Sequence, residues 1–121
     1  MLAPIPPRML SQTATISVPS SFDQWGNVDA VQSYAVNRVH LQPSNKVKKT
    51  KDNTEVILRS VLFIDGRLSV PALNIQALQR SAEEAGGVLT VFVDGVTYAV
   101  LTVELIPDDM GRLHHWELGL V

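Results

Sequence analysis

Three histidines are the side chains of this sequence that are best suited to hold a metal ion. His114 and His115 are adjacent, whereas His40 is distant in the sequence, and the chain contains no cysteine. Adjacent residues of a β-strand point to opposite faces, so His114 and His115 are poorly placed to bind one ion together. A zinc site also needs three or four protein ligands. We therefore expect no metal site, with His114 facing inward and neutral and His115 facing outward.

Two acidic pairs are the other candidates for chemistry, and neither sits in a catalytic motif. Asp108-Asp109 precedes Gly111 and is typical of a turn. Glu83-Glu84 falls late in a predicted helix, where a solvated surface is the simplest interpretation. The sequence has no glycine-rich phosphate loop, no His-Glu-x-x-His and no Gly-x-Ser-x-Gly. We expect neither an enzyme nor a bound cofactor.

A cluster of lysines is the strongest charge feature. Lys46, Lys48, Lys49 and Lys51 lie within six residues, which leaves six basic and twelve acidic residues elsewhere. A charge run of this kind is most often the solvated tip of a hairpin. The two alternatives are a contact with an acidic patch of a neighbouring subunit and a contact with DNA phosphates. Because no aromatic residue is interleaved, a DNA contact would be one of point charges rather than base recognition.

Length and composition predict one soluble globular domain. The chain has 121 residues, 45% of them apolar and 18% charged, which is enough for a core without disulfides. No apolar run approaches the roughly 20 residues that span a membrane. The N-terminal segment does not resemble a signal peptide, because Arg8 follows three prolines and no apolar stretch comes after it. We expect no membrane association and no export by this route.

The N-terminal residues 1–11 are expected to form an extended arm, because Pro4, Pro6 and Pro7 disfavour regular structure. Together with Arg8, these prolines are candidate contacts with a neighbouring subunit. Residues 12–121 are expected to form a single domain that resembles a β-barrel.

Alternating apolar residues predict several strands in that domain. Pro19 should end the first strand, and a change of parity near Asn37-Arg38 predicts a bulge in the second. Asp94-Gly95 favours a type I′ hairpin. In the last strand, Trp116 should face the core together with Leu118 and Leu120. The expected strands span 13–18, 33–41, 54–65, 88–93, 96–105 and 112–121, with a loop or hairpin tip at 43–53.

Two further features complete the predicted fold. The apolar spacing over 74–85, followed by Gly86-Gly87, predicts a short helix that must pack on the sheet. Trp25 lies in a turn region, and we expect it to cover one end of the core; a contact with a neighbouring subunit is the alternative. The fold class is therefore mostly β, a small antiparallel barrel or sandwich of six to seven strands with one short helix insertion.

Both ends of the chain resemble one family. The C-terminal sequence from Gly111 to Val121, Gly-Arg-Leu-His-His-Trp-Glu-Leu-Gly-Leu-Val, is similar to the ending of phage minor capsid, or head–tail connector, proteins. The N-terminal Leu-Ala-Pro-Ile-Pro-Pro-Arg and the Thr-Ala-Thr strand are similar to the opening of the same family. Segments that resemble the family in the same order are 23–27, 61–65, 69–71 and 95–98.

The resemblance implies a structural part of the virion neck. Such a head-closure, or stopper-like, protein would form a ring around the DNA channel. Its partners would be other copies of itself, the portal–adaptor complex, a tail completion or tail terminator protein, and packaged DNA. The implied location is the virion neck, with assembly in the host cytoplasm. The helix at 74–85 is an insertion relative to the family pattern.

Two alternatives remain open. One is a nucleic-acid-binding barrel, which would need basic and aromatic side chains on one strand face. The other is a tail-completion protein on the tail side of the same neck. The strands carry Arg38 and Arg59 without an aromatic stacking pair beside them, so the head-closure assignment is the one we favour.

Overall fold

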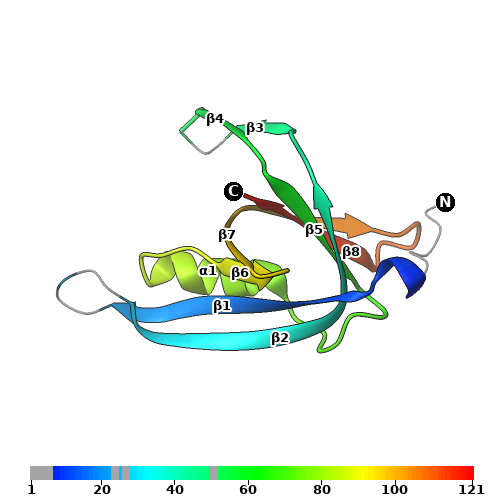
Figure 1. The fold of residues 1–121 in the computed structure, drawn as a ribbon, viewed down its shortest axis with the longest axis horizontal. Coiled ribbons are helices and arrows are strands. Elements are labelled where there is room, and N and C mark those ends of the chain that lie inside the picture. The colour runs from blue at the N-terminus through cyan, green and yellow to red at the C-terminus, as the bar shows by residue number, and fades with distance from the viewer. Residues whose placement is uncertain (1–6, 23–24, 26–27, 50–51) are drawn as a thin grey trace.

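In a computed structural model of the chain, six strands close into an antiparallel barrel (Figure 1). The structure describes residues 7–22, 25, 28–49 and 52–121. The order of strands around the barrel is β1-β2-β5-β8-β7-β6, and β3 and β4 form a separate two-stranded sheet. The prediction of a small, mostly β fold with one short helix is confirmed. The elements are η1 (Pro7–Met9), β1 (Gln12–Phe22), β2 (Val28–Pro43), β3 (Val47–Lys49), β4 (Glu55–Ile57), β5 (Ser60–Asp65), α1 (Ile75–Glu84), β6 (Thr90–Val93), β7 (Val96–Pro107) and β8 (Leu113–Leu120).

The C-terminal strand β8 lies between two other strands of the barrel. It pairs with β5 on one side and with β7 on the other. Trp116, Leu118 and Leu120 are all buried, as their shared parity predicts. They meet inward-facing residues of β5 such as Leu62 and Ile64 in one hydrophobic core. The end of the sequence is therefore part of the core.

Strands β1 and β2 form a hairpin that is longer than its hydrophobic pattern suggests. Arg38 has a φ of 61° at a register shift opposite Gln12 and Thr13, which confirms the predicted bulge. The prediction that Pro19 ends the first strand is wrong, because Pro19 pairs with Val31 and the strand continues. The register becomes irregular directly after Pro19, and such irregularity is where a ladder accommodates a proline.

Helix α1 begins and ends at the expected signals. The side chain of Asn74 accepts a hydrogen bond of 3.2 Å from the backbone N–H of Ala77, which caps the N-terminus. Gly86 has a φ of 86°, and Gly87 N–H donates to the carbonyl of Ala82 at 2.8 Å, which closes a Schellman motif. Ile75 and Ala82 are buried, and the helix packs mainly along β1.

The chain before the barrel differs from the expected extended arm. Pro4 and Pro6 lie outside the described residues. Pro7–Met9 form a turn of 3-10 helix instead of extended chain. Leu10, only 3% exposed, then enters the core. Burial of this leucine accounts for the local order, because a buried leucine side chain contributes about 1.5–3 kcal/mol.

Within the described residues, no helix is long and apolar enough to cross a membrane.

Candidate functional site

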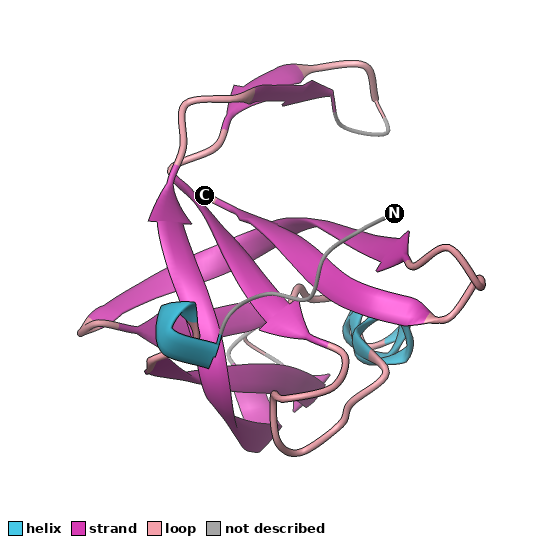
Figure 2. Cartoon of the chain, turned by 90° about the vertical axis from the view of Figure 1, so that its right-hand side faces the viewer, coloured by secondary structure: helices cyan, strands magenta, loops and turns pink. Residues whose placement is uncertain are grey.

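A two-stranded ribbon projects from one end of the barrel and carries the lysines (Figures 1 and 2). We call residues 46–49 and 52–57, which include β3 and β4, the lysine ribbon. Its register places Val47 opposite Ile57 and Lys49 opposite Glu55. Residues 43–53 were expected to be a loop or hairpin tip, and the structure shows that three of them, Val47–Lys49, are a paired strand. The sequence did not predict this strand because it is only three residues long and contains a single apolar residue, Val47, among lysines.

The base of the lysine ribbon is fixed to the barrel. Leu58 is 1% exposed, and its N–H donates to the carbonyl of Lys46 at 2.8 Å. Arg59 N–H donates to the carbonyl of Leu120 at 2.8 Å. A Cβ added at Gly119 would lie 3.0 Å from a methyl carbon of Leu58 and would also clash with the Thr102 hydroxyl. Glycine at this position therefore lets the ribbon base pack closely against β8.

The four lysines are not equivalent. Lys48 points back to the barrel, where its Nζ lies 2.9 Å from Oε1 of Glu104 on β7. Lys46 and Lys49 are exposed, whereas Lys51 lies outside the described residues. Neutralisation of Lys48 by Glu104 leaves Lys46 and Lys49 as the described lysines available to a partner.

The outer face of the lysine ribbon also exposes apolar side chains. Val47 and Ile57 lie directly opposite each other, and 55% and 65% of their surfaces are exposed. The lysine ribbon therefore carries an exposed apolar pair beside its exposed lysines, Lys46 and Lys49.

Trp25 lies in the turn that connects β1 and β2, and 78% of its surface is exposed. The expectation that it covers one end of the core is wrong. The long β1–β2 hairpin reaches one extremity of the molecule (Figure 1). The alternative role, contact with a neighbouring subunit, stays a prediction. The same holds for Arg8, which is exposed on η1, and for Pro7 within η1.

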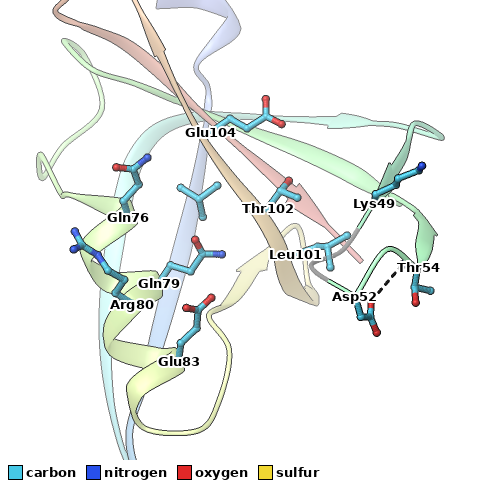
Figure 3. Close-up of a pocket in the computed structure, with 11 residues that line it drawn as sticks. Lys49, Asp52, Thr54, Gln76, Gln79, Arg80, Glu83, Leu101, Thr102 and Glu104 are labelled. Carbon is cyan, nitrogen blue, oxygen red and sulfur yellow. Dashed lines mark hydrogen bonds between the residues drawn. The ribbon is translucent and has the colours of Figure 1, made fainter.

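A broad groove lies between α1, β7 and the lysine ribbon (Figure 3). Its volume is about 960 Å³. Strand β7 forms its floor, α1 forms one wall, and Lys49, Asp52 and Thr54 form the other (Figure 3). No sequence motif pointed to this groove, because it arises where segments distant in the sequence meet. The helix contributes Gln76, Gln79, Arg80 and Glu83, β7 contributes Leu101, Thr102, Val103 and Glu104, and the ribbon side contributes Lys49, Asp52 and Thr54.

The histidines form a contact that the alternation of strand residues did not predict. The Nδ1 atoms of His114 and His115 lie 2.8 Å apart, and Nε2 of His115 lies 3.2 Å from Glu117. The ring of His115 also contacts Phe63, which contacts His40. Both adjacent histidines are half-buried. The prediction that His114 faces inward and His115 faces outward is therefore not confirmed. Within the described ranges, no group of three or more potential ligands could hold a metal ion.

Asp108 organises the turn before β8, as its sequence context predicts. Its carboxylate accepts backbone hydrogen bonds from Met110 at 2.8 Å and Arg112 at 2.9 Å. Desolvation raises the pKa of Asp108, but these two hydrogen bonds and the nearby Arg112 guanidinium outweigh it and hold the pKa below its usual value. The Asp108 carboxylate therefore stabilises the turn through these backbone hydrogen bonds.

The sequence profile of a family described as minor capsid protein matches residues 6–120. No curated protein and no solved structure matches the chain significantly.

Proposed function

The chain belongs to the minor capsid protein family, a structural family of phages, and on that premise we propose that it closes the head at the virion neck. In this role a ring of copies sits between the portal–adaptor complex and the tail. It holds the packaged DNA and provides the surface on which a tail completion or tail terminator protein docks. The chain acts by assembly and performs no turnover.

The observation that carries this proposal is the lysine ribbon. A connector needs a rigid body with projecting elements that reach neighbouring subunits, because closed rings are built from heterologous contacts. The barrel supplies the body. The ribbon supplies exposed Lys46 and Lys49 next to the exposed apolar pair Val47 and Ile57. This combination suits either an acidic neighbour or the phosphates of DNA in the channel.

The barrel surface favours this role over that of a nucleic-acid-binding barrel. The expectation that Arg59 has no aromatic residue beside it is wrong, because its Cζ lies 4.9 Å from the centroid of the Tyr98 ring. Tyr98 is buried, so this pair cannot stack on a base. A row of aromatic side chains crosses β2, β5 and β8, in which His40 contacts Phe63 and Phe63 contacts His115. Glu117 accompanies them, and a carboxylate would repel phosphate.

A phage that lacks this gene tests the proposal. Without head closure, we expect packaged heads that lose their DNA and accumulate beside unattached, finished tails. Heads that stay full and stable while tails remain unattached would instead indicate a tail-completion protein. Normal infectious particles would contradict both roles. Complementation with the wild-type gene is the control.

A further inference from the structure

The floor of the groove is a strand edge that has no partner strand among the described residues. Strand β6 pairs with β7 only from Val96 to Ala99. Val100 N–H then donates to the carbonyl of Leu89 at 2.9 Å. From Val100 to Pro107, β7 pairs with β8 on its other side, and no other strand in the described part of the chain pairs with it there. An unpaired strand edge is a template for an added strand.

The groove around this edge has room and walls suited to an extended peptide. Its volume of about 960 Å³ lies within the range of protein ligand pockets. Leu101 and Val103 give it apolar contacts, and Val103 also packs against the core. Gln76 and Gln79 line the opposite wall on α1 (Figure 3). Amide side chains donate and accept hydrogen bonds, so they can bind the outer edge of an added strand.

We propose that residues 1–6 of a second copy occupy this groove as an added strand along β7. The inference deepens the proposed ring and rests on it for the presence of a neighbouring copy. Six extended residues span about 20 Å, which matches the six residues of β7 from Leu101 to Ile106. Of the three acidic side chains that line the groove, Glu104 pairs with Lys48, which leaves two acidic and two basic side chains. This balanced lining suits residues 1–6, whose side chains are all uncharged.

The prolines of this segment fit the role of a strand that pairs on one side only. In an extended strand, consecutive backbone N–H groups point to opposite edges. Pro4 and Pro6 remove the donors from one edge, whereas Ala3 and Ile5 keep theirs on the other. The segment can therefore bind one strand edge and cannot extend the sheet further. Ala3 and Ile5 also share a face, so both present apolar side chains to the same side of the groove.

Engineered disulfides test this docking directly, because the natural chain has no cysteine. The variant carrying both Ile5→Cys and Val103→Cys should form a ladder of disulfide-linked dimers, trimers and higher species, both in virions and in concentrated protein. A mixture of the two single variants should give dimers only. The matched control, Ile5→Cys with Asp109→Cys in the exposed turn after β7, should give no ladder.

Two other outcomes would overturn the inference. An internal disulfide in a monomer would show that the segment binds its own chain, and the absence of any cross-link would show that the segment does not occupy the groove. A thermal unfolding transition like that of the wild type confirms that the double variant is folded.

A peptide probe supplies an independent measurement. A synthetic peptide of residues 1–8 should bind the protein truncated before Pro7. N-methylation of Ala3 and Ile5, which removes both donors, should weaken binding about tenfold or more. Equal binding of both peptides would contradict an added strand.

The inference and the proposed function can fail separately. If the protein lies at the neck and no ladder forms there, the docking of residues 1–6 is wrong while the role in head closure stands. If a ladder forms from protein that lies elsewhere in the virion, the docking is supported and the role in head closure is wrong.

Discussion

The Nζ atom of Lys48 lies 2.9 Å from Oε1 of Glu104, a residue 56 positions later in the sequence. This ion pair connects the inner face of the lysine ribbon to β7. Because β7 also forms the floor of the groove, the pair links the two surfaces that we assign to assembly. Its side chains remain 35% and 44% exposed, so solvent screens the interaction and it orients the ribbon more than it stabilises the fold.

The first prediction concerns this ion pair. Glu104→Gln should change the free energy of unfolding by no more than about 1 kcal/mol, the usual range for an exposed pair. The ribbon should nevertheless become more mobile, which backbone relaxation of Val47–Lys49 would detect by NMR. Arg112→Gln, which removes the surface pair with Asp108, is the control and should leave ribbon relaxation unchanged. A rigid ribbon in Glu104→Gln would show that its packed base alone determines its orientation.

The second prediction contrasts the two tryptophans. Trp116 is 4% exposed and Trp25 is 78% exposed. Trp116→Ala should lower the free energy of unfolding by about 3–5 kcal/mol, the range for emptying a large aromatic core site. Trp25→Ala should change it by less than about 0.5 kcal/mol and should reduce assembly into particles instead. Chemical denaturation of both variants gives the comparison, and a similar loss in each would be incompatible with the burial described here.

The third prediction is a pH dependence at Asp108. Its pKa in the folded protein is lowered from the usual 3.8, so ionised Asp108 stabilises the fold above this pH, and the contribution is lost as the pH falls through the lowered value. Asp108→Ala should therefore melt below the wild type at pH 7, and the difference should shrink in acid.

Asp108→Asn is the matched control for that measurement. It keeps an acceptor oxygen for the backbone N–H groups of Met110 and Arg112 and removes the charge. Its melting temperature should lie between those of the wild type and Asp108→Ala at pH 7. A difference between wild type and Asp108→Ala that is constant from pH 7 to pH 3 would show that the charge contributes nothing.

The sequence predicted the core elements well because each carries a local signal. The helix could be located from Asn74 and Gly86-Gly87, which satisfy backbone groups at its two ends. The inward face of β8 followed from the strict alternation of Trp116 and Leu118 with polar neighbours. Such signals depend on residues close together in the chain.

The features that could not be predicted depend on distant residues. Pro19 was expected to end a strand, but pairing with Val31 continues the ladder past it. The groove exists because β6 is shorter than β7 and α1 packs beside it, and no single segment encodes that difference. The exposed position of Trp25 follows from the length of the β1–β2 hairpin. In each case the outcome depends on partners that a local pattern does not identify.

The fourth prediction concerns the lysines. Replacing Lys46, Lys48, Lys49 and Lys51 by Ser should leave folding nearly unchanged, since exposed charges contribute little stability. Assembled particles should retain DNA less well, and added salt should partly reproduce the defect in the wild type. If the contacts are with phosphate, the salt dependence of DNA affinity should lose about 0.9 in slope for each contact removed.

Arg112→Gln is the control for the lysine experiment. It removes a positive charge from the turn before β8, outside the lysine ribbon, so this variant should retain DNA like the wild type. A loss restricted to one protein–protein step would identify an acidic subunit as the partner of the ribbon. Variant particles with normal yield, DNA content and salt tolerance would mean that the ribbon is only a solvated projection.

The position of the protein in the virion tests the central claim most directly. Gold-labelled antibody fragments against an epitope tag at the exposed turn containing Asp109, viewed by cryo-electron microscopy, would locate it. We predict label at the joint between head and tail, with averaged density forming a ring around the channel. Label distributed over the capsid shell or along the tail tube would contradict the assignment to the neck.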